Sequence, residues 1–594
     1  MRYFYLSFFI FLLNFPGYSQ TGELAKNYYD QGEYEKALRT YKKLIDQNPN
    51  NVTYFIGLIS SHQQLEDFSA AEKLLLERLN NTANAPNLLV ELGYNYELQE
   101  KEEKAEQYYR EALKAIEARP NYAYSIAQSF ERYSLLDKAI EAYETGMRLN
   151  PDTNYNIQLA RLYGEQGRIE AMFSNYIDLV GQNPSFLPTV RGMFGQFITE
   201  DPGNESNIIF RKLLLKKLQE NQDILFNEML SWLFMQQKEF KKAFLQEKAI
   251  YRRSEEKQLG RIIQLAVMSQ EEDPETALEV LDFIVNEAPS EEIVLQAHQI
   301  KLLVQQEIAG RKEYATIEKA YRDLLETYGK GLKTLGIQVD FANFMAFKKE
   351  EKEAGIVLLN ELLGNNLSEF QEAAVKMALA DILVLDEKFN QALIYYSQIQ
   401  KLVENDVMAQ NARFKVAKTS YYKGDFQWAT TQLDVLKSST SQLIANDAME
   451  LSLLISDNSR EDSTQTALKL YAKADLLSFQ NKDTEAIEVL NSILENHKAE
   501  KIEDEALLKQ AQLFEAAGYF SKAEENYLAI IEHHKNGILG DNAHFGLAEL
   551  YLDKLDEPHK AQEFYEKIIF NYADSIYFVD ARKKYRVLRG DQLE

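Results

Sequence analysis

Histidine is the residue type whose spacing in this chain most resembles a site for chemistry. Four of the seven histidines could offer imidazole ligands to a zinc ion from one short C-terminal stretch: His533, His534, His544 and His559. His533 and His534 are adjacent, so on a helix their side chains point in different directions. We interpret these histidines as surface residues of helices and predict no metal site and no cofactor.

The sequence contains none of the short motifs that carry a known catalytic mechanism. It has no G-x-x-x-x-G-K-[ST], G-x-S-x-G, H-E-x-x-H or G-x-G-x-x-G, and the absence of cysteine excludes thiolate nucleophiles and disulfides. The 92 aspartates and glutamates lie mostly in predicted helices, where chance pairs are common. Pairs such as Glu106 and Arg110 at i, i+4 support a helix by about 0.2–0.5 kcal/mol. We therefore predict that the chain is not an enzyme.

The charge of the chain restricts its partners. A formal net charge of −26 repels phosphate backbones, so we expect no nucleic-acid binding. The exception is the last predicted helix, which is crowded with cations: Arg582, Lys583, Lys584, Arg586 and Arg589. These cations either complement the C-terminal end of the helix macrodipole or form a docking patch for an acidic partner or a membrane surface.

Residues 1–19 have the parts of a secretory signal peptide. Arg2 supplies the positive end, an apolar run of about 13 residues follows, and the small residues Gly17 and Ser19 precede cleavage expected after Ser19 or Gln20. A membrane span needs roughly 17–25 residues, and no second run of that length follows. We predict export to the periplasm or the periplasmic face of the outer membrane, with no integral span in the mature chain. An uncleaved N-terminal anchor or cytoplasmic retention is the alternative.

The helices that would position any functional surface recur with a fixed period. Ala37, Ala71, Ala105 and Ala139 are 34 residues apart, and Met172 follows after 33. Sparse glycine and proline, 25 and 11 residues, favour helices over turn-rich β structure. Unrelated amphipathic helices would not keep such a register, so we predict a repeat protein built from helix pairs.

The third repeat has the fullest pattern, with Leu92-Gly93-x-x-Tyr96 followed by Ala105-x-x-x-Tyr109. This pattern resembles the tetratricopeptide repeat. Small side chains let paired helices approach closely, tyrosines fill the gaps, and stacking of neighbouring pairs supplies the core that one pair lacks. The resemblance implies an all-α, right-handed α-solenoid of stacked antiparallel helix pairs, whose concave face is lined by the first helix of each pair.

The resemblance covers most of residues 21–590 and divides the chain into segments. It is strong up to residue 185, weak between 186 and 340, and moderate beyond, where spacings of 37 or 38 residues dominate among Ala354, Ala392, Ala429, Ala486, Ala523 and Ala561. We predict a signal peptide at 1–19, an N-terminal array at 20–185, irregular helical repeats at 186–340 and a C-terminal array at 341–594.

Binding is expected on the concave face of the N-terminal array. In the register of the repeat, the side chains that project inward are Asn87, Tyr94, Asn121, Tyr124, Gln128, Asn154, Gln158 and Arg161. Amide and tyrosine side chains can hold an extended peptide backbone through hydrogen bonds and ring contacts. Chaperone-binding members of the family use a Lys/Asn carboxylate clamp, which the matching positions lack here. The alternative interpretation is a polar groove without a ligand.

These observations favour a non-enzymatic adaptor that binds protein or peptide partners in the bacterial cell envelope, in a secretion, outer-membrane assembly or cell-wall complex. An uncleaved, membrane-tethered or cytoplasmic scaffold is the first alternative. An enzyme or carbohydrate-binding domain within residues 186–340 is the second. The sequence leaves the partner and the oligomeric state open.

Overall fold

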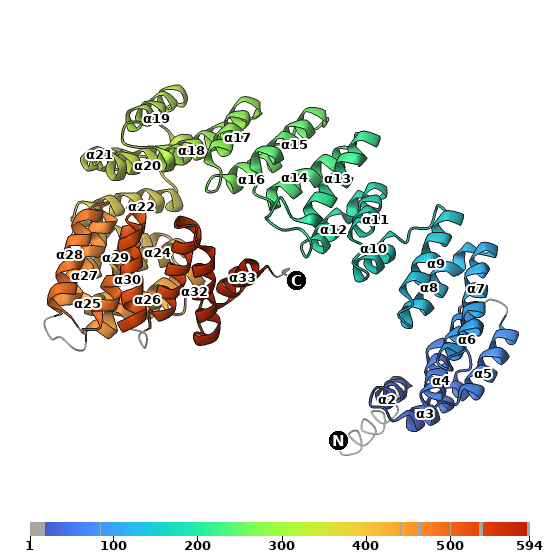
Figure 1. Cartoon of the computed structure of the whole chain (residues 1–594). Helices are drawn as coiled ribbons and strands as arrows, with labels where there is room; N and C mark the ends of the chain where they lie inside the picture. The colour runs from blue at the N-terminus through green and yellow to red at the C-terminus, as the bar shows by residue number, and fades with distance from the viewer. Residues whose placement is uncertain are drawn as a thin grey trace, which may run out of the picture. The chain divides into compact units, whose positions relative to one another are not determined.

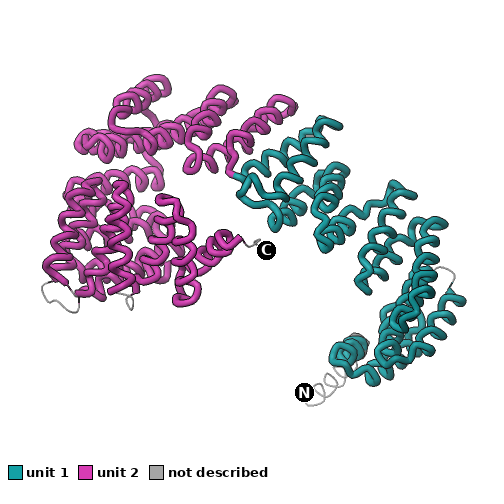
Figure 2. Tube along the Cα trace, in the orientation of Figure 1, with its two compact units in different colours: residues 1–237 teal, residues 238–594 magenta. Residues whose placement is uncertain are grey.

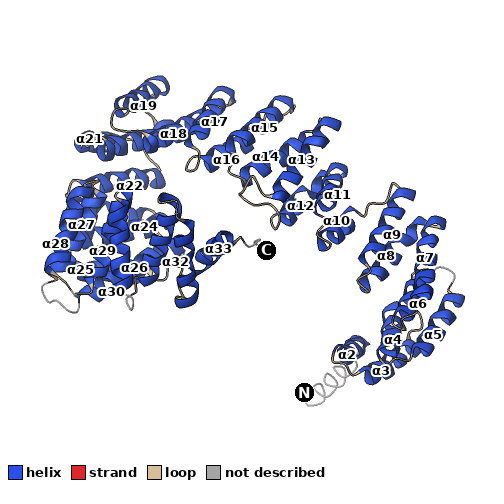
Figure 3. Ribbon diagram, viewed as in Figure 1, coloured by secondary structure: helices blue, strands red, loops and turns tan. Residues whose placement is uncertain are grey.

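A computed structural model describes residues 18–590 except 83–84, 440, 460–464, 499 and 534–537. All regular elements among these residues are helices, and no strand occurs in them (Figures 1 and 3). Consecutive helices pack as pairs, and the pairs pack on one another. The predicted all-α solenoid of stacked helix pairs is therefore confirmed. Of the predicted signal segment, residues 1–17 lie outside the described part of the chain.

The helices form two compact units, residues 1–237 and residues 238–594 (Figure 2). The boundary between them falls inside the segment predicted to hold irregular repeats. The predicted limits of that segment, at 186 and 340, remain predictions.

Unit 1 begins with five regular pairs and ends with three further helices. The pairs are α2 and α3 (Tyr18–Asp30, Tyr34–Gln47), α4 and α5 (Val52–Gln64, Phe68–Asn81), α6 and α7 (Leu88–Glu97, Glu102–Ala118), α8 and α9 (Ala123–Arg132, Leu136–Leu149), and α10 and α11 (Asn156–Glu165, Ile169–Gln182). Two short 3₁₀ turns, η1 (Pro120–Tyr122) and η2 (Pro184–Phe186), precede α8 and α12 (Leu187–Phe194), and α13 (Glu205–Glu220) and α14 (Ile224–Gln236) complete the unit.

The backbone of unit 1 repeats as regularly as its sequence. The turn inside each pair contains one residue with a positive φ, and these residues are Gly32, Glu66, Glu100, Ser134 and Gly167. Their spacings of 34, 34, 34 and 33 residues match those of the alanine series. The 34-residue period is thus a period of the backbone conformation and not only of side-chain type.

Unit 2 starts with helices that depart from the regular pattern. They are α15 (Phe240–Arg253), α16 (Gly260–Ser269), α17 (Pro274–Glu287), α18 (Glu291–Ile308), α19 (Tyr314–Tyr328), the 3₁₀ turn η3 (Leu332–Thr334) and α20 (Leu335–Asn343). A π-helical turn, η4 (Phe344–Lys348), extends α20 and leads into α21 (Lys352–Leu363).

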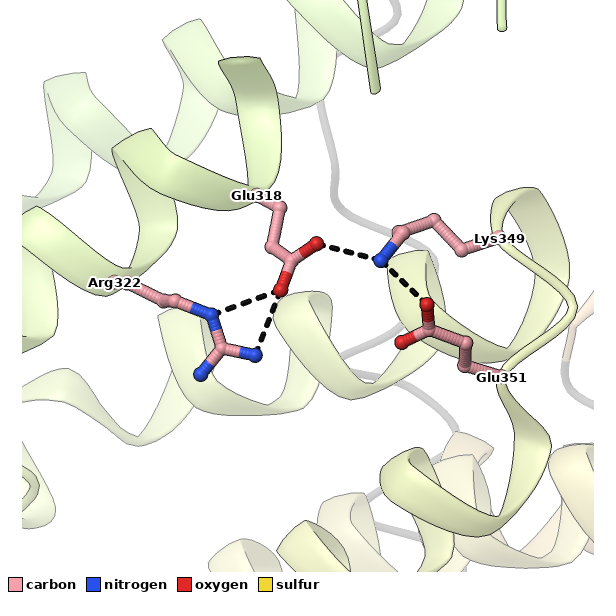
Figure 4. Close-up of polar contacts among 4 residues, drawn as sticks. All are labelled: Glu318, Arg322, Lys349 and Glu351. Atoms are coloured by element: carbon pink, nitrogen blue, oxygen red, sulfur yellow. Dashed lines mark hydrogen bonds and ion pairs between the residues drawn. The ribbon is translucent and has the colours of Figure 1, made fainter. Parts of the chain in front are cut away.

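A chain of ion pairs links α19 to the turn before α21 (Figure 4). The Glu318 carboxylate accepts hydrogen bonds from Arg322 at 2.7 and 2.8 Å and from Lys349 Nζ at 2.5 Å, and Lys349 also reaches Glu351 at 2.6 Å. Hydrogen bonds from Lys349 and Arg322 lower the pKa of Glu318. These contacts fasten the irregular part of unit 2 to the array that follows it.

The rest of unit 2 returns to helix pairs, with one exception. The pairs are α22 and α23 (Glu369–Leu385, Phe389–Leu402), α24 and α25 (Val407–Tyr422, Phe426–Leu436), α27 and α28 (Thr466–Phe479, Asp483–Asn496), α29 and α30 (Ile502–Ala516, Phe520–His533), and α31 with its π turn η5 and α32 (Gly540–Glu549, Leu550–Lys554, Pro558–Asn571). A final helix, α33 (Phe578–Arg589), follows α32.

The exception is α26 (Gln442–Ser459), a single helix between two pairs. In the turns inside the pairs α22–α23 and α24–α25, the positive-φ residues Glu387 and Gly424 are 37 residues apart. The corresponding residue inside the next pair, Asn481 between α27 and α28, follows Gly424 by 57. The extra 20 residues correspond to α26 and its connections. Because α24 contacts α27 directly, the array continues past the inserted helix, and α26 adds Ala448, Leu451 and Ile455 to the core there.

The spacing between the positive-φ turn residues of successive pairs rises from 37 to 38 at the last pair, and an insertion of one residue accounts for this change. The N–H of Lys482 bonds to the carbonyl five residues earlier, whereas the N–H of Glu557 reaches the carbonyl of Tyr551, six residues earlier. The π turn η5 therefore holds one more residue than the corresponding α-helical end. This residue lengthens the spacing from Gly518 to Asp556 to 38.

Close packing of α6 on α7 depends on Gly93. A Cβ atom added to Gly93 would lie 2.3 Å from Cε1 of Tyr109, a side chain that is 2 % exposed. The tyrosine ring thus occupies the space that any larger residue would need. This contact explains why glycine and tyrosine recur together in the repeat.

We predict that Gly93→Ala weakens the α6–α7 pair by about 1–3 kcal/mol through overpacking. Hydrogen exchange measured by mass spectrometry should show faster opening of peptides from these two helices. Gly192→Ala is the control, because nothing lies within 4 Å of the added Cβ. Equal exchange in the two variants would contradict the close-approach argument.

The inserted helix places carboxylates near the start of α29. Burial raises the pKa of Glu505 from its ordinary value of 4.5 to about 8, with further contributions from Asp504, Glu450 and Asp457. Between pH 4.5 and about 8, the folded chain therefore holds a proton at Glu505 that the unfolded chain releases. Its contribution to stability falls as the pH rises from 4.5 towards 8 and is constant above that range.

We predict that unit 2 unfolds at a lower urea concentration at pH 8.5 than at pH 6, with a loss of about 1.4 kcal/mol for each pKa unit traversed. Glu505→Gln should remove most of this loss, while Glu525→Gln, on an exposed position of α30, should not. A pH dependence that is the same in wild type and in Glu505→Gln would show that another group is responsible.

Candidate functional site

The predicted binding residues lie on α6, α8 and α10 and at the turns that lead into them. These three helices are the first helices of consecutive pairs in unit 1. Side chains from one first helix contact those of the next, so the helices present a joined surface. We call the surface formed by α6, α8 and α10 the first-helix face.

A buried carboxylate joins α6 to the end of α8. Glu91 is fully buried, and it accepts hydrogen bonds from Arg132 at 2.6 Å and from the Tyr133 hydroxyl. Burial raises the pKa of Glu91, and the charge of Arg132 opposes this effect. The predicted residue Tyr94 stacks on Tyr133, with ring centroids 3.7 Å apart and planes 15° apart. Tyr94 is therefore held in place by a contact with the next repeat.

A second carboxylate joins α8, α9 and α10. Glu131 accepts a hydrogen bond from the buried Tyr143 hydroxyl at 2.8 Å and forms an ion pair with the predicted residue Arg161. Arg161 also pairs with Glu165 at 2.6 Å. Because two carboxylates hold this guanidinium, Arg161 does not offer the unpaired cation that a clamp for a ligand carboxylate requires.

Tyr124 and Gln128 form the most accessible part of the first-helix face. The Tyr124 side chain is 43 % exposed, and its hydroxyl accepts a hydrogen bond from the Gln128 amide at 2.8 Å. Its ring lies near Tyr155, with centroids 6.2 Å apart and planes 25° apart. The hydroxyl proton of Tyr124 can still be donated to a peptide carbonyl, and the exposed ring can contact a side chain.

The other predicted residues take different positions. Asn154 uses its side chain locally, since its amide donates to Gln182 at 2.6 Å and its oxygen accepts the N–H of Asn156 at 2.9 Å. Asn121 is exposed in η1, Asn87 is half-buried at the start of α6, and Gln158 is half-buried on α10. The structure thus joins Tyr124 to Gln128 directly and ties Tyr94 and Arg161 to residues that were not predicted.

The residues missed from the sequence are charged or aromatic groups that connect neighbouring helices. Glu91 interrupts the apolar run LLVELG, and a carboxylate in such a run was a signal for a buried polar contact. Arg132, Tyr133 and Tyr155 gave no comparable signal, because their positions follow from the stacking angle between pairs.

The arrangement of tyrosine, carboxylate and cation recurs in unit 2. Asp381 accepts from the Tyr396 hydroxyl at 2.5 Å and from Lys415 at 2.8 Å. Glu549 likewise accepts from Tyr565 and from Lys584, the latter at 2.6 Å. Each case joins the first and second helices of one pair to the next first helix, so this network is a feature of the repeat and is not specific to the candidate site.

The histidines and carboxylates outside the first-helix face do not gather into a metal site in the described part of the chain. Within the described ranges, no group of three or more histidine, aspartate or glutamate side chains could hold a metal ion. The interpretation of these histidines as surface residues is wrong for His544, which is buried with its Nδ1 2.7 Å from the Gly540 carbonyl. His533 and His559 are exposed, and His534 lies outside the described residues. An open depression is found on the second helix α7, away from the predicted residues, and its lining is Glu102, Glu103, Glu106, Gln107 and Arg110.

Two segments of unit 1 match models of known protein families. A family model described as TPR repeat matches residues 25–58, and another described as Tetratricopeptide repeat matches residues 86–119. The chain contains tetratricopeptide repeats. The matched segments include Ala37 and Ala105 of the 34-residue series. Tetratricopeptide repeats indicate a protein-interaction scaffold.

The solved structures that are similar to this chain include the following three. Naa15/Naa10 bound to HypK-THB matches at 11 % identity over 96 % of each chain, with a TM-score of 0.26. The APC/C hetero-tetramer Cut9-Hcn1 matches at 13 % identity over 95 % of each chain, with a TM-score of 0.22. Yeast Tom70 matches at 14 % identity over 85 % of this chain and 96 % of its own, with a TM-score of 0.27.

Among the helices described, none combines the length and the hydropathy required to cross a lipid bilayer.

We predict that Glu131→Ala loosens α8 to α11, because it leaves the buried Tyr143 hydroxyl without its acceptor and Arg161 without one partner. The expected loss is about 1–3 kcal/mol of local stability, measured as faster hydrogen exchange in peptides from these helices. Glu141→Ala, on an exposed position of α9, is the matched control. If both variants exchange at the same rate, the Glu131 contacts do not hold the first-helix face together.

Proposed function

We propose that this chain is a non-enzymatic tetratricopeptide adaptor that binds an extended peptide segment of a protein partner on the first-helix face of unit 1. The observation that carries the proposal is the exposed Tyr124–Gln128 pair, which lies between two cross-helix contacts. Tyr94 is fixed by stacking on Tyr133, and Arg161 is fixed by Glu131 and Glu165. The surface is thus rigid before a ligand arrives, which lowers the entropy lost on binding.

The character of the first-helix face favours the backbone of a ligand over its charged ends. Tyrosine hydroxyls and amides can both donate and accept hydrogen bonds, so they match the alternating groups of an extended chain. The guanidinium of Arg161 is already paired, which argues against recognition of a terminal carboxylate. The proposed ligand is therefore an internal segment of a partner.

We place this adaptor in the bacterial cell envelope, at the periplasm or the periplasmic face of the outer membrane. The support is the signal-like composition of residues 1–19. N-terminal sequencing of the mature protein tests this placement. A start at Gln20 or Thr21 would support export with cleavage, and a start at Met1 would favour the tethered or cytoplasmic alternative.

We predict that a photo-crosslinking amino acid at position 124 or 128 captures one discrete partner in intact cells, since these side chains are the exposed part of the first-helix face. The same probe at Glu103 or Gln107, on the outer surface of α7, is the control. Ile157, an exposed residue of α10, provides a third probe position on the same face. Tyr124→Ala combined with Gln128→Ala should reduce capture through a probe at position 157 by about tenfold, the loss of roughly 1.4 kcal/mol.

The result that would contradict the proposal is equal capture from the two surfaces, or an adduct at position 157 that the double alanine variant leaves unchanged. Either outcome would place the partner elsewhere on the chain.

A further inference from the structure

The last helix of unit 2, α33, presents a face that its own repeat does not cover (Figure 1). Ala581 is fully buried, and Tyr585 and Leu588 pack against the core formed with α31 and α32. The opposite side of the helix is solvent-exposed along Val579, Lys583 and Val587, which are spaced four residues apart and so share one stripe.

Large apolar side chains project from this end of unit 2. Val579 and Val587 of α33 are 73 % and 54 % exposed, Ile576 before α33 is 83 % exposed, and Phe570 near the end of α32 is 74 % exposed.

Cations lie on the same helix as Val579 and Val587. Arg582 and Lys583 are exposed, and Arg589 lies over the ring of Tyr585 at 5.5 Å. In the sequence, α33 contains five cationic residues and one carboxylate, Asp580, in a chain whose net charge is −26. Lys584 pairs with Glu549, so its charge is compensated.

We propose that the outer face of α33, together with Ile576 and Phe570, binds the surface of an anionic phospholipid membrane. Stable attachment of a peripheral protein needs two signals, and apolar side chains beside a basic cluster supply them. Apolar side chains that are more than half exposed project from the protein surface, so they can insert into a fluid lipid surface. A helix of a protein partner would instead need a groove on this chain in which to lie. The acidic remainder of the chain is repelled by the same lipids, which orients unit 2 with α33 towards the membrane.

This inference goes beyond the proposed function and uses different residues. The first-helix face belongs to unit 1, and the α33 face belongs to unit 2. A variant of one face leaves the other unchanged, so the failure of one proposal is separate from the failure of the other.

The test is flotation of the full mature protein with vesicles. Vesicles of phosphatidylcholine containing roughly one-third phosphatidylglycerol should bind the protein, and vesicles of phosphatidylcholine alone should bind it at least tenfold less. Raising the salt to about 0.5 M NaCl should release it, because screening shortens the range of the attraction.

Two variants of the face separate the charge from the apolar contribution. Arg582→Glu with Lys583→Glu should reduce binding about tenfold or more, and Val579→Ser with Val587→Ser should do the same by removing the apolar contact without changing the charge. Asp580→Asn should strengthen binding. Matched controls are Lys212→Glu with Lys216→Glu, which changes the net charge equally at exposed positions of α13, and Leu443→Ser, at a position that is 76 % exposed on α26.

Circular dichroism establishes that each variant is folded, and Arg582→Gln with Lys583→Gln replaces the charge reversal if that variant is not. Loss of vesicle binding in the α33 variants alone supports the proposal. It is overturned if the wild-type protein does not float with anionic vesicles, or if control and α33 variants bind equally. It is also overturned if the α33 variants lose an acidic protein partner while vesicle binding is unchanged.

Discussion

The structure depends on the burial of apolar helix faces by the neighbouring helix pair. A pair of helices of about 14 residues each is too small to enclose a core, so its outer apolar stripe must be covered by the next pair. Fully buried residues accordingly lie on both helices of a pair, as with Ala127 on α8 and Ala139 on α9. Because each pair covers the next, stability passes along the chain through nearest neighbours.

Tyrosine gives this stacking its specificity. The rings of Tyr143, Tyr396 and Tyr565 are fully buried between helices, and each hydroxyl reaches a carboxylate on the first helix of its own pair. That carboxylate also holds a cation from the next first helix, so one polar contact fixes the position of three helices. The same contacts hold the first-helix face rigid in unit 1, which links the packing of the repeat to the surface proposed to bind a partner.

The sequence was most informative where one side chain type must recur. The alanine series predicted the helix pairs of residues 20–185, because the short distance between paired helices admits only small residues at Ala105 or Gly93. The positive-φ turns have the same period as this series.

The inserted helix α26 was not predicted. Its apolar residues follow an ordinary helical period, and only the 57-residue gap between Gly424 and Asn481 distinguishes it. Of the candidate site, Tyr124 and Gln128 were named from the repeat register. Their neighbours were not, because contacts such as Tyr94 on Tyr133 depend on the angle between pairs.

The most direct measurement of nearest-neighbour stacking is the removal of one complete repeat. Deletion of residues 101–134 joins Glu100 to Leu135 at equivalent points of two turns, and it lets Glu97 take the place of Glu131 beside Tyr143. The account predicts a folded chain with unchanged helical content per residue by circular dichroism, whereas deletion of residues 101–117, which removes one helix of a pair, should cause a large loss of helix. Equal loss of helix in both deletions would contradict the account.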